Sequence, residues 1–576
     1  MRCALGSSCF AFALLLLLAA CETPPPAVPA KGPAASSCLS IASWNDLHGQ
    51  LVPDEVQLEV NRVPAGGIVA LADQLAAVRA TGDAVVTLDA GDLFTGPLES
   101  TLAEGAPVID AYNVMGVDAA AVGNHEFDFG PVGYARVVAA PNVGDEGGAD
   151  GPRGALLARM AAARFPFLSA NVHRTGGGAL GYPHLLPSTH VRRGGFDVGV
   201  VGYTTVDTPI TTLKPNIVGL DFATNAAASV AAEVHALRAS GASPIVLLAH
   251  ASLDGVLPQE LDDGSDPEGQ KRTGELATLV DGMPKADRPD LVIAGHRHHW
   301  MVGRLRGIPI VSSLYHGVGL TQVRYCRAPG ATTPRLERID RRVALPSTTP
   351  STPLGHAVAT TIAPWLARVQ EQADRVITTL ARPCPSRAAD GTALAEQNAR
   401  AIAEQCGAAA PAPPGVPVVA FVNAGILRVP LRAGPVRFRD VFATAPFENG
   451  VAVCATTRRG LERTIANSIR SPEAREQLTF GIAGAKVLLA RAADRSLTVR
   501  RVLLDGAVRG VPERDDDRVW LAVPDFILWG GDALLDGVEC TSSATSQLHV
   551  RDAWRAVLAR EQACDGPPKN VVIEGP

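Results

Sequence analysis

Five short polar motifs hold the side chains of this sequence that are best suited to chemistry. Each motif follows a short apolar run and is rich in Asp, Asn and His. Together they supply seven candidate metal ligands, namely Asp46, His48, Asp92, Asn124, His250, His296 and His298. Mixed carboxylate, imidazole and amide groups suit divalent ions of intermediate hardness, such as Zn²⁺, Mn²⁺ or Co²⁺. Seven ligands are too many for one tetrahedral ion, but they suit two ions that share a bridging carboxylate.

Two metal ions about 3.5–4 Å apart support one particular chemistry. Such a pair can hold a hydroxide nucleophile and clamp the oxygens of a phosphoryl group during in-line displacement. Each motif alone has an ordinary explanation, because a single Asp or His is more often a cap or a hydrogen-bonded buried side chain. All five motifs in this order, each after an expected strand, favour a dimetal centre.

A sheet is needed to bring these motifs together. Seven short apolar runs alternate with Ala-rich stretches typical of helices, and they cover residues 39–43, 84–88, 119–122, 198–201, 245–248, 291–294 and 308–312. Near-continuous apolar strands are typical of a sheet covered by helices on both faces. Ligands of open α/β sheets bind at the carboxyl ends of the strands, where the motifs would meet. The sequence therefore predicts an α/β sandwich over residues 39–345.

The remainder of the chain predicts a connecting segment and a second unit. Residues 346–382 begin with a Pro- and Ser/Thr-rich linker and continue as a long Ala-rich helix over 356–380, a natural hinge between two units. Residues 383–576 show an α+β pattern. Lys and Arg number 52 against 58 Asp and Glu, so the chain lacks the excess of positive charge that is typical of proteins that bind polymeric nucleic acid. No obligate protein partner is evident.

The N-terminus is typical of an export signal. Residues 1–20 contain one early cation and an eleven-residue apolar run that is short for a membrane span. The segment ends in Ala19-Ala20, and Cys21 follows directly. This ending resembles the lipobox of bacterial lipoproteins, which implies a lipid anchor on Cys21 and a Pro/Ala-rich tether over 21–38. Glu22 rather than Asp follows, which favours the outer membrane. The alternative is a plain secretory signal. Seven further Cys leave at least one thiol unpaired, and their pairing is open.

The motif order DxH, GD, GNHEFD, H and GHxH resembles the calcineurin-like metallophosphatases, in particular the 5′-nucleotidase / UDP-sugar hydrolase family. The most specific match is GNHEFDFG at residues 123–130, and the resemblance extends over about 39–563. It implies a four-layer α/β/β/α metallophosphatase sandwich joined by a helix to an α+β 5′-nucleotidase C-terminal domain. It also implies that the second domain rotates relative to the first.

The resemblance also implies roles for individual residues. One metal would be held by Asp46, His48, Asp92 and His298, and the other by Asp92, Asn124, His250 and His296. His125 would be a catalytic residue that is not a ligand, and it would stabilise developing charge or protonate the leaving oxygen. Asp128 would orient His125 and keep it cationic; the alternative is a helix N-cap.

Further matches in the second unit imply a nucleotide pocket. Residues 423–428 (NAGILR) resemble the family's NGGGIR segment, with two larger residues in place of Gly. Asn423 would approach the base and Arg428 would bind phosphate. Phe447 and Phe526 would stack on the two faces of the base, although core packing is the alternative for each. Asp532 would accept hydrogen bonds from the ribose. Arg387 is an extra phosphate ligand by position, or else an ordinary surface Arg.

We therefore expect an exported, lipid-anchored dimetal phosphohydrolase of the cell envelope that acts on nucleoside 5′-monophosphates and also on nucleotide diphosphate sugars. Three alternatives remain. The scaffold is shared by 2′,3′-cyclic nucleotide 2′-phosphodiesterases with 3′-nucleotidase activity and by the sulfur-oxidation thiosulfohydrolase. A catalytically inactive surface lipoprotein that binds nucleotides is the third, but every ligand of the GNHE and GHxH motifs is retained.

Overall fold

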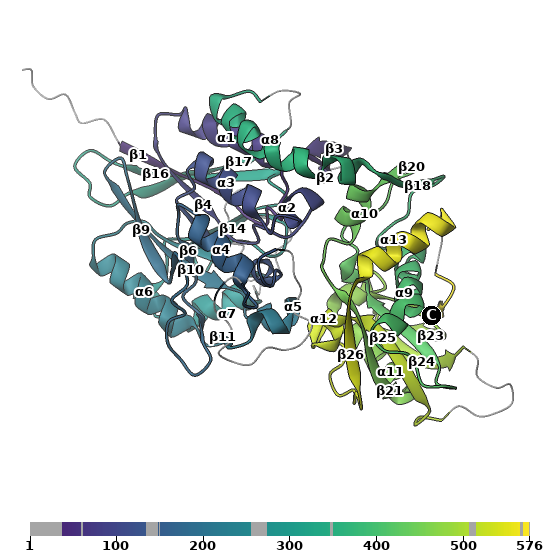
Figure 1. Cartoon of the computed structure of the whole chain (residues 1–576). Coiled ribbons are helices and arrows are strands. Elements are labelled where there is room, and N and C mark those ends of the chain that lie inside the picture. Colours follow the sequence, from purple (N-terminus) through teal and green to yellow (C-terminus); the bar gives the residue numbers. More distant parts are fainter. Residues whose placement is uncertain are drawn as a thin grey trace, which may run out of the picture.

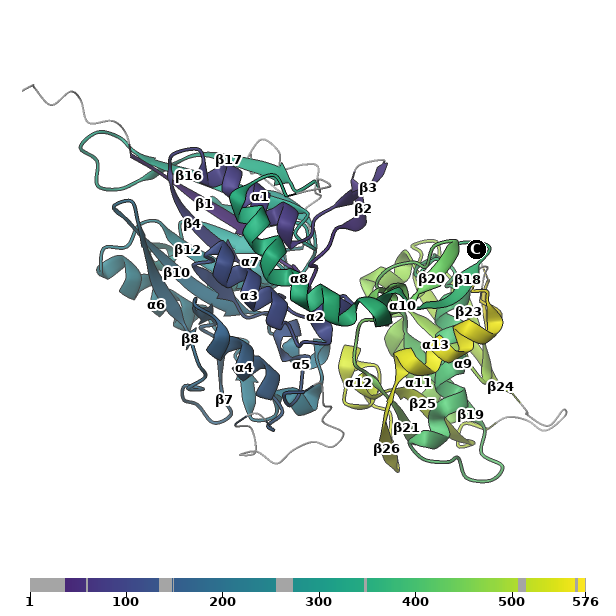
Figure 2. The ribbon, with the colours of Figure 1, turned by 45° about the horizontal axis from the view of Figure 1, so that its top comes forward.

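The computed structural model describes residues 37–58, 61–133, 148, 150–254, 273–345, 350–505, 514–564 and 568–574. Two lobes are visible in Figures 1 and 2, and helix α8 (Pro353–Asp374) leads from one to the other. The expected signal segment, Cys21 and most of the tether lie outside the described residues. In the part of the chain that is described, no helix is both long and apolar enough to cross a bilayer.

The first lobe is built on two sheets. The seven-stranded sheet has the order β17 (Arg335–Val343), β16 (Gly319–Arg327), β1 (Ser37–Trp44), β4 (Ala84–Asp89), β5 (Ala119–Ala121), β6 (Phe167–Leu168) and β8 (Leu185–Leu186). The six-stranded sheet has the order β14 (Trp300–Leu305), β15 (Ile308–Ser313), β13 (Leu291–Ala294), β12 (Ile245–His250), β10 (Phe196–Thr204) and β9 (Ser188–Arg193). Strands β1, β4, β5, β6 and β8 run parallel to one another, as do β10, β12, β13 and β15.

Helices cover the outer face of each sheet, so the lobe has four layers. One core cluster lies between the sheets and takes Ile41 and Leu88 from one, and Val200 and Leu248 from the other. The seven-stranded sheet is covered by α1 (Ile68–Arg79), α3 (Ala106–Met115), α4 (Gly154–Ala162) and α8. The six-stranded sheet is covered by α6 (Ala227–Ala239) and α7 (Glu275–Gly282). The expected α/β/β/α sandwich is confirmed, because apolar strands buried on both faces require this cover.

The second lobe contains a five-stranded sheet with helices on both faces. Its strand order is β22 (Phe480–Ala483), β19 (Val418–Asn423), β25 (Arg518–Pro524), β21 (Gly450–Thr457) and β26 (Ser543–His549). Helices α9 (Ala393–Gln405) and α13 (Val550–Glu561) pack on one face. The other face packs against α11 (Arg458–Ser468) and a smaller sheet of β24 (Leu497–Leu504), β23 (Ala485–Arg491) and β27 (Val571–Glu574).

The smaller elements complete the fold. They are β2 (Asp54–Leu58), β3 (Asn61–Ala65), α2 (Leu98–Thr101), β7 (Val172–Arg174), α5 (Thr208–Thr211), β11 (Leu220–Phe222), β18 (Val376–Leu380), β20 (Gly434–Arg437), α10 (Phe438–Thr444) and α12 (Asp525–Leu528). Three disulfides lie within the lobes, and they join Cys38 to Cys326, Cys384 to Cys564 and Cys454 to Cys540. Cys406 is a buried free thiol, which agrees with the odd number of cysteines.

The helix expected over residues 356–380 differs at both ends from helix α8. It begins earlier, because the Thr352 side chain accepts a hydrogen bond from the Gly355 amide and Pro353 suits the first helical position. It ends at Asp374, and residues 376–380 form strand β18, which pairs with β20. The prediction of helix over 376–380 was therefore wrong. The β-branched run VITT at 376–379 favours a strand.

The end of α8 packs between the two lobes. Ala373 of α8 shares a small core cluster with Leu98 of α2 and with Phe438 and Phe442 of α10. The guanidinium of Arg439 reaches the carboxylate of Glu99 across the lobes at 3.3 Å. These contacts place α10 of the second lobe beside the strand ends of the first.

Candidate metal centre and substrate site

The seven candidate ligands all lie at the carboxyl ends of strands. They come from both sheets, because three motifs follow β1, β4 and β5, His250 ends β12, and the last motif follows β13. Asp46, Asp92 and His250 are at most 1% exposed. The site therefore lies where the carboxyl edges of the two sheets meet, and the side chains are shielded from bulk water.

The ligands form two groups. In each group the three ligand atoms lie within 4.8 Å of one another, and the groups are Asp46, His48 and His298, and Asp92, His250 and His296. In the first group, the Nε2 atoms of His48 and His298 are 3.0 Å apart. In the second group, Nε2 of His250 is 3.0 Å from Oδ2 of Asp92. Each group is compact enough to hold one ion.

Short contacts also join the two groups. Oδ2 of Asp92 lies 3.7 Å from Nε2 of His48, so this carboxylate reaches both groups. Asn124 belongs to neither group of titratable ligands, but its Oδ1 is 3.1 Å from Nδ1 of His296. All seven side chains that the sequence suggested are thus brought to one place.

The hydrogen bonds of the imidazoles fit metal ligation. Nδ1 of His48 lies 3.0 Å from the Thr95 carbonyl oxygen, and Nδ1 of His250 lies 2.8 Å from that of Ala90. A carbonyl oxygen can only accept, so each Nδ1 donates and each Nε2 is left to face the site. This backbone support is usual for metal-binding histidines.

The electrostatics of the site favour bound positive charge. Burial alone would lower the pKa of His250, but the Asp92 carboxylate raises it to about 10. Burial and the charge of His250 lower the pKa of His296 to about 3, which leaves a neutral imidazole suited to a metal. The mixed donor set, its burial and its two carboxylates therefore fit two divalent ions.

Several ligand-bearing residues have left-handed backbone conformations. The φ angles are positive at Asp46, His48, Asp92, His296 and His298, between 48° and 76°. Such conformations are uncommon for residues with a side chain and cluster at functional sites. Close approach also requires a glycine at 123, since a Cβ there would lie 2.2 Å from Oδ1 of Asp92. The strand ends are thus bent to aim their side chains at one point.

Some supporting residues were missed by the sequence interpretation. The fully buried Glu126 accepts hydrogen bonds from the amides of Asp92, Leu93 and Gly123 at 2.6–3.0 Å. It belongs to the GNHE motif, so a signal was available. Tyr315 stacks on His298 with ring centroids 5.1 Å apart. It follows β15, a further parallel strand whose carboxyl end points to the site.

His125 and Asp128 form a hydrogen-bonded pair beside the ligand groups. Nδ1 of His125 is 2.6 Å from Oδ2 of Asp128, whose Oδ1 accepts from the Thr212 hydroxyl at 2.9 Å. Burial lowers the pKa of His125, but the carboxylates of Asp128 and Asp92 outweigh it and the pKa is raised. Asp128 ends a short 3₁₀ turn over residues 125–127, so its interpretation as a helix N-cap was wrong. Thr212 had no local sequence signal.

The second lobe contributes directly to this site. Phe447 stacks on the His125 ring with centroids 5.7 Å apart and an interplanar angle of 25°. The Arg428 guanidinium carbon lies 5.5 Å from the Phe447 ring centroid. Burial and the charge of Arg387 lower the pKa of Arg428, so the exposed Arg387 is also close. Arg428 therefore lies close to the candidate metal ligands, and Arg387 lies near Arg428.

The remaining predicted substrate residues form a second group. Nδ2 of Asn423 donates to Oδ2 of Asp532 at 2.7 Å, and Asp532 has a φ angle of 52°. Phe526 packs against Gly531, where a Cβ would lie 2.4 Å from its ring. Phe447 and Phe526 are both half-buried, at the edges of different core clusters. The structure thus brings Phe526 towards Asp532, and Phe447 towards Arg428 and His125.

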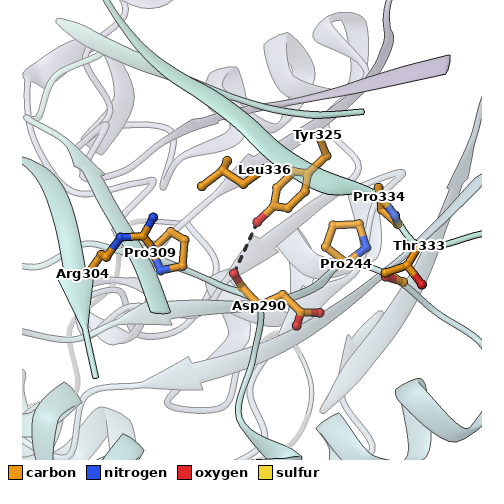
Figure 3. A pocket seen from close by; sticks show the side chains of 9 residues that line it. Pro244, Asp290, Arg304, Pro309, Tyr325, Thr333, Pro334 and Leu336 are labelled. Atoms are coloured by element: carbon orange, nitrogen blue, oxygen red, sulfur yellow. Dashed lines mark hydrogen bonds between the residues drawn. The ribbon is translucent and has the colours of Figure 1, made fainter. Parts of the chain in front are cut away.

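A separate cavity of about 320 Å³ lies in the first lobe, and Figure 3 shows the side chains that line it. It is found near the amino ends of β12, β13 and β15, and Asp290, Arg304 and Tyr325 are its main polar side chains. The Tyr325 hydroxyl donates to the Asp290 carbonyl oxygen at 3.3 Å. None of the seven candidate ligands lines this cavity, so it is not part of the site.

Comparisons with known proteins agree with this architecture. The sequence model for the 5′-nucleotidase C-terminal domain matches residues 369–537. A 5′-nucleotidase of Mus musculus is 30% identical over 228 residues, which is 38% of this chain and 35% of the relative. A probable 5′-nucleotidase of Treponema pallidum is 29% identical over 283 residues, which is 47% of this chain and 39% of that relative. The matched region thus spans little more than a third of the length of these relatives.

Solved structures share the fold over nearly the whole chain. A 5′-nucleotidase precursor of Thermus thermophilus has a TM-score of 0.70 at 20% identity and covers 93% of this chain and 99% of that one. The sulfate thiohydrolase SoxB of the same organism has a TM-score of 0.65 at 18% identity, and the match covers 95% of this chain and 97% of that one. The chain therefore has the two-lobe fold of these structures, and residues 369–537 of it match a 5′-nucleotidase C-terminal domain. The chain is thus similar to 5′-nucleotidases, in sequence over part of its length and in fold over nearly all of it.

Proposed function

We propose that this protein hydrolyses nucleoside 5′-monophosphates to nucleosides and phosphate. The observation that carries the proposal is that Phe447 of the second lobe stacks on His125 of the first, with the Arg428 guanidinium beside the Phe447 ring. A phosphate-binding cation and an aromatic ring beside a candidate dimetal centre suit a substrate with a phosphate and a base. When bound, two divalent ions supply the positive charge that polarises a phosphoryl group and generates the nucleophile.

The chain's own residues then divide the work. The Arg428 guanidinium binds phosphate oxygens by paired hydrogen bonds, and Arg387 adds a second positive charge. His125, oriented by Asp128, stabilises charge on the phosphoryl group or protonates the leaving 5′ oxygen. Asn423 and Asp532 bind the nucleoside, with Asp532 as the acceptor for ribose hydroxyls. Residues 39–345 act as the chemical unit, residues 346–382 as linker and hinge, and residues 383–576 as the substrate unit.

A substrate panel tests the reaction and its alternatives. The protein is stripped of metal, reloaded with single metals, and assayed on AMP, UMP, ATP, UDP-glucose, 2′,3′-cyclic AMP and bis-p-nitrophenyl phosphate. We expect AMP and UMP to be the best substrates, with slower cleavage of UDP-glucose. Preference for the cyclic nucleotide would contradict the proposal and favour a cyclic phosphodiesterase. Nucleotide binding without turnover under every metal would favour an inactive binding protein.

Replacing both Phe447 and Phe526 by alanine is expected to weaken binding of the base. Stacking on an aromatic ring is worth roughly 1–3 kcal/mol per base, so we expect KM for AMP to rise about tenfold or more. The KM for p-nitrophenyl phosphate, which has no nucleobase, should change much less. Both KM values are measured by steady-state kinetics. Equal increases for the two substrates would remove the stacking role.

We also propose that the protein is exported and lipid-anchored in the cell envelope, facing the periplasm or the surface. The three disulfides support export, because disulfides persist in oxidising compartments. The Cys21→Ser variant is expected to leave the membrane fraction and be recovered as soluble protein, since no acylated cysteine would hold it. Cell fractionation and immunoblotting measure this, with Cys9→Ser as the matched control. A Cys21→Ser protein that stays with the membrane would contradict the anchor.

A further inference from the structure

The loop that carries Phe447 has no regular secondary structure of its own. It comprises residues 445–449, between α10 and β21. The Phe447 side chain of this loop stacks on His125 of the first lobe. Backbone carbonyls of such a loop must find donors when they are buried. The donors come from a segment about 100 residues later, at the start of helix α13.

Arg551 is the centre of this support. Its side chain is only 3% exposed, and its Nη1 donates to the carbonyl oxygens of Ala445, Pro446 and Phe447 at 3.2, 3.3 and 3.4 Å. Its Nη2 donates to Oε1 of Glu448 at 2.7 Å. One guanidinium therefore contacts four consecutive residues of the loop, residues 445–448.

Three further contacts complete the support. Nδ1 of His549 is 3.0 Å from Oε2 of Glu448, and the Val550 amide donates to the Asn449 carbonyl at 2.8 Å. The guanidinium of Arg551 also contacts α10, with its carbon 3.7 Å from the Phe442 ring centroid. A buried arginine keeps its charge, so it needs the Glu448 carboxylate as a partner. The arrangement fixes the loop from its amino end to its carboxyl end.

We propose that Arg551 is a positioning residue for substrate, which holds the 445–449 loop so that Phe447 is presented to the nucleobase beside His125. This inference rests on the proposed function. Lysine cannot replace Arg551 in this role, because a single ammonium group cannot span three carbonyls and a carboxylate. The residue does not touch the reacting atoms, and its effect on substrate is transmitted by the loop.

The test compares Arg551→Met with Arg555→Met in the full-length protein. Arg555 is a matched control, because it lies one turn further along α13 and its guanidinium also faces an α10 ring, that of Phe438 at 5.1 Å. We expect Arg551→Met to raise KM for AMP about tenfold, with a much smaller change for p-nitrophenyl phosphate. Arg551→Lys should recover only part of the loss. Arg555→Met should leave both KM values as in the wild type.

Hydrogen–deuterium exchange gives a readout that does not depend on turnover. Peptides covering 445–450 should exchange faster in Arg551→Met than in the wild type, and at the wild-type rate in Arg555→Met. If Arg551→Met does not fold, the double variant Arg551→Met/Glu448→Gln removes both buried charges, and the same rise in KM for AMP is expected. An unchanged KM for AMP in the folded variants, or equal rises for both substrates, would overturn the inference.

Failure of the proposed function is distinguished by the wild-type protein. If it hydrolyses p-nitrophenyl phosphate but neither AMP nor UMP, the nucleotidase proposal fails, and the role of Arg551 in substrate positioning falls with it. If it hydrolyses AMP and the Arg551 variants keep the wild-type KM, the nucleotidase proposal stands and only the positioning role is wrong.

Discussion

Replacing Asp92 by asparagine is expected to abolish both metal binding and turnover. The Asp92 carboxylate reaches both ligand groups, at 3.0 Å from Nε2 of His250 and 3.7 Å from Nε2 of His48. Burial would raise its pKa, but the neighbouring imidazoles of His250 and His125 hold the pKa well below its usual value. Asp92 is therefore a carboxylate, and asparagine removes this buried negative charge while keeping the shape of the side chain.

The loss should be large because, with Asp92 as the proposed bridging ligand, both ions would depend on its charge. Metal ions supply several kcal/mol of transition-state stabilisation, so we expect kcat to fall by ~10³-fold or more. Metal content after dialysis, measured by mass spectrometry, should fall below two ions per chain. Asp281→Asn is the control, since that partly exposed carboxylate pairs with Arg306 away from the site. An Asp92→Asn protein with normal metal content and rate would refute the bridging role.

The architecture of the first lobe could be predicted because its strands are nearly continuous apolar runs. Each expected strand overlaps an observed one, and the motif residues directly follow these strands or, like His250, end one. Parallel strands place their carboxyl ends at one edge, so proximity of the polar motifs followed from topology alone. The left-handed conformations of Asp46 and His298 could not be predicted, since neither residue type nor neighbours signal them.

Long-range partners were the part that local patterns could not predict. The Thr212 hydroxyl supports Asp128 across 84 residues, and Arg551 supports the Phe447 loop across more than 100. Such pairs are set by how separate elements pack, and the sequence near either partner is ordinary. Disulfide pairing could not be predicted for the same reason, because Cys38 and Cys326 come together only through the pairing of β1 with β16. The contact of Phe447 with His125 also depends on how the two lobes meet.

Replacing His125 by alanine is expected to retain the metals but to slow turnover of AMP by about 10²–10⁴-fold. His125 is in neither ligand group, and its Nδ1 is engaged by Asp128 at 2.6 Å. Nε2 is therefore the nitrogen that can act on substrate. The variant should bind two ions per chain as the wild type does, and kcat should fall with little change in KM. A loss of metal would contradict its assignment as a residue that is not a ligand.

The leaving group shows which role His125 plays. A nucleoside leaves as a strongly basic alkoxide unless it is protonated, whereas p-nitrophenolate is a weak base and leaves without a proton. If His125 protonates the leaving oxygen, His125→Ala should lose much more activity on AMP than on p-nitrophenyl phosphate. If it stabilises charge on the phosphoryl group, the two losses should be similar. His190→Ala is the matched control, because His190 also pairs with an aspartate, Asp197 at 2.9 Å, but on the distant strand β9. Wild-type rates in the control would show that the loss belongs to the position of His125 and not to removal of a His–Asp pair.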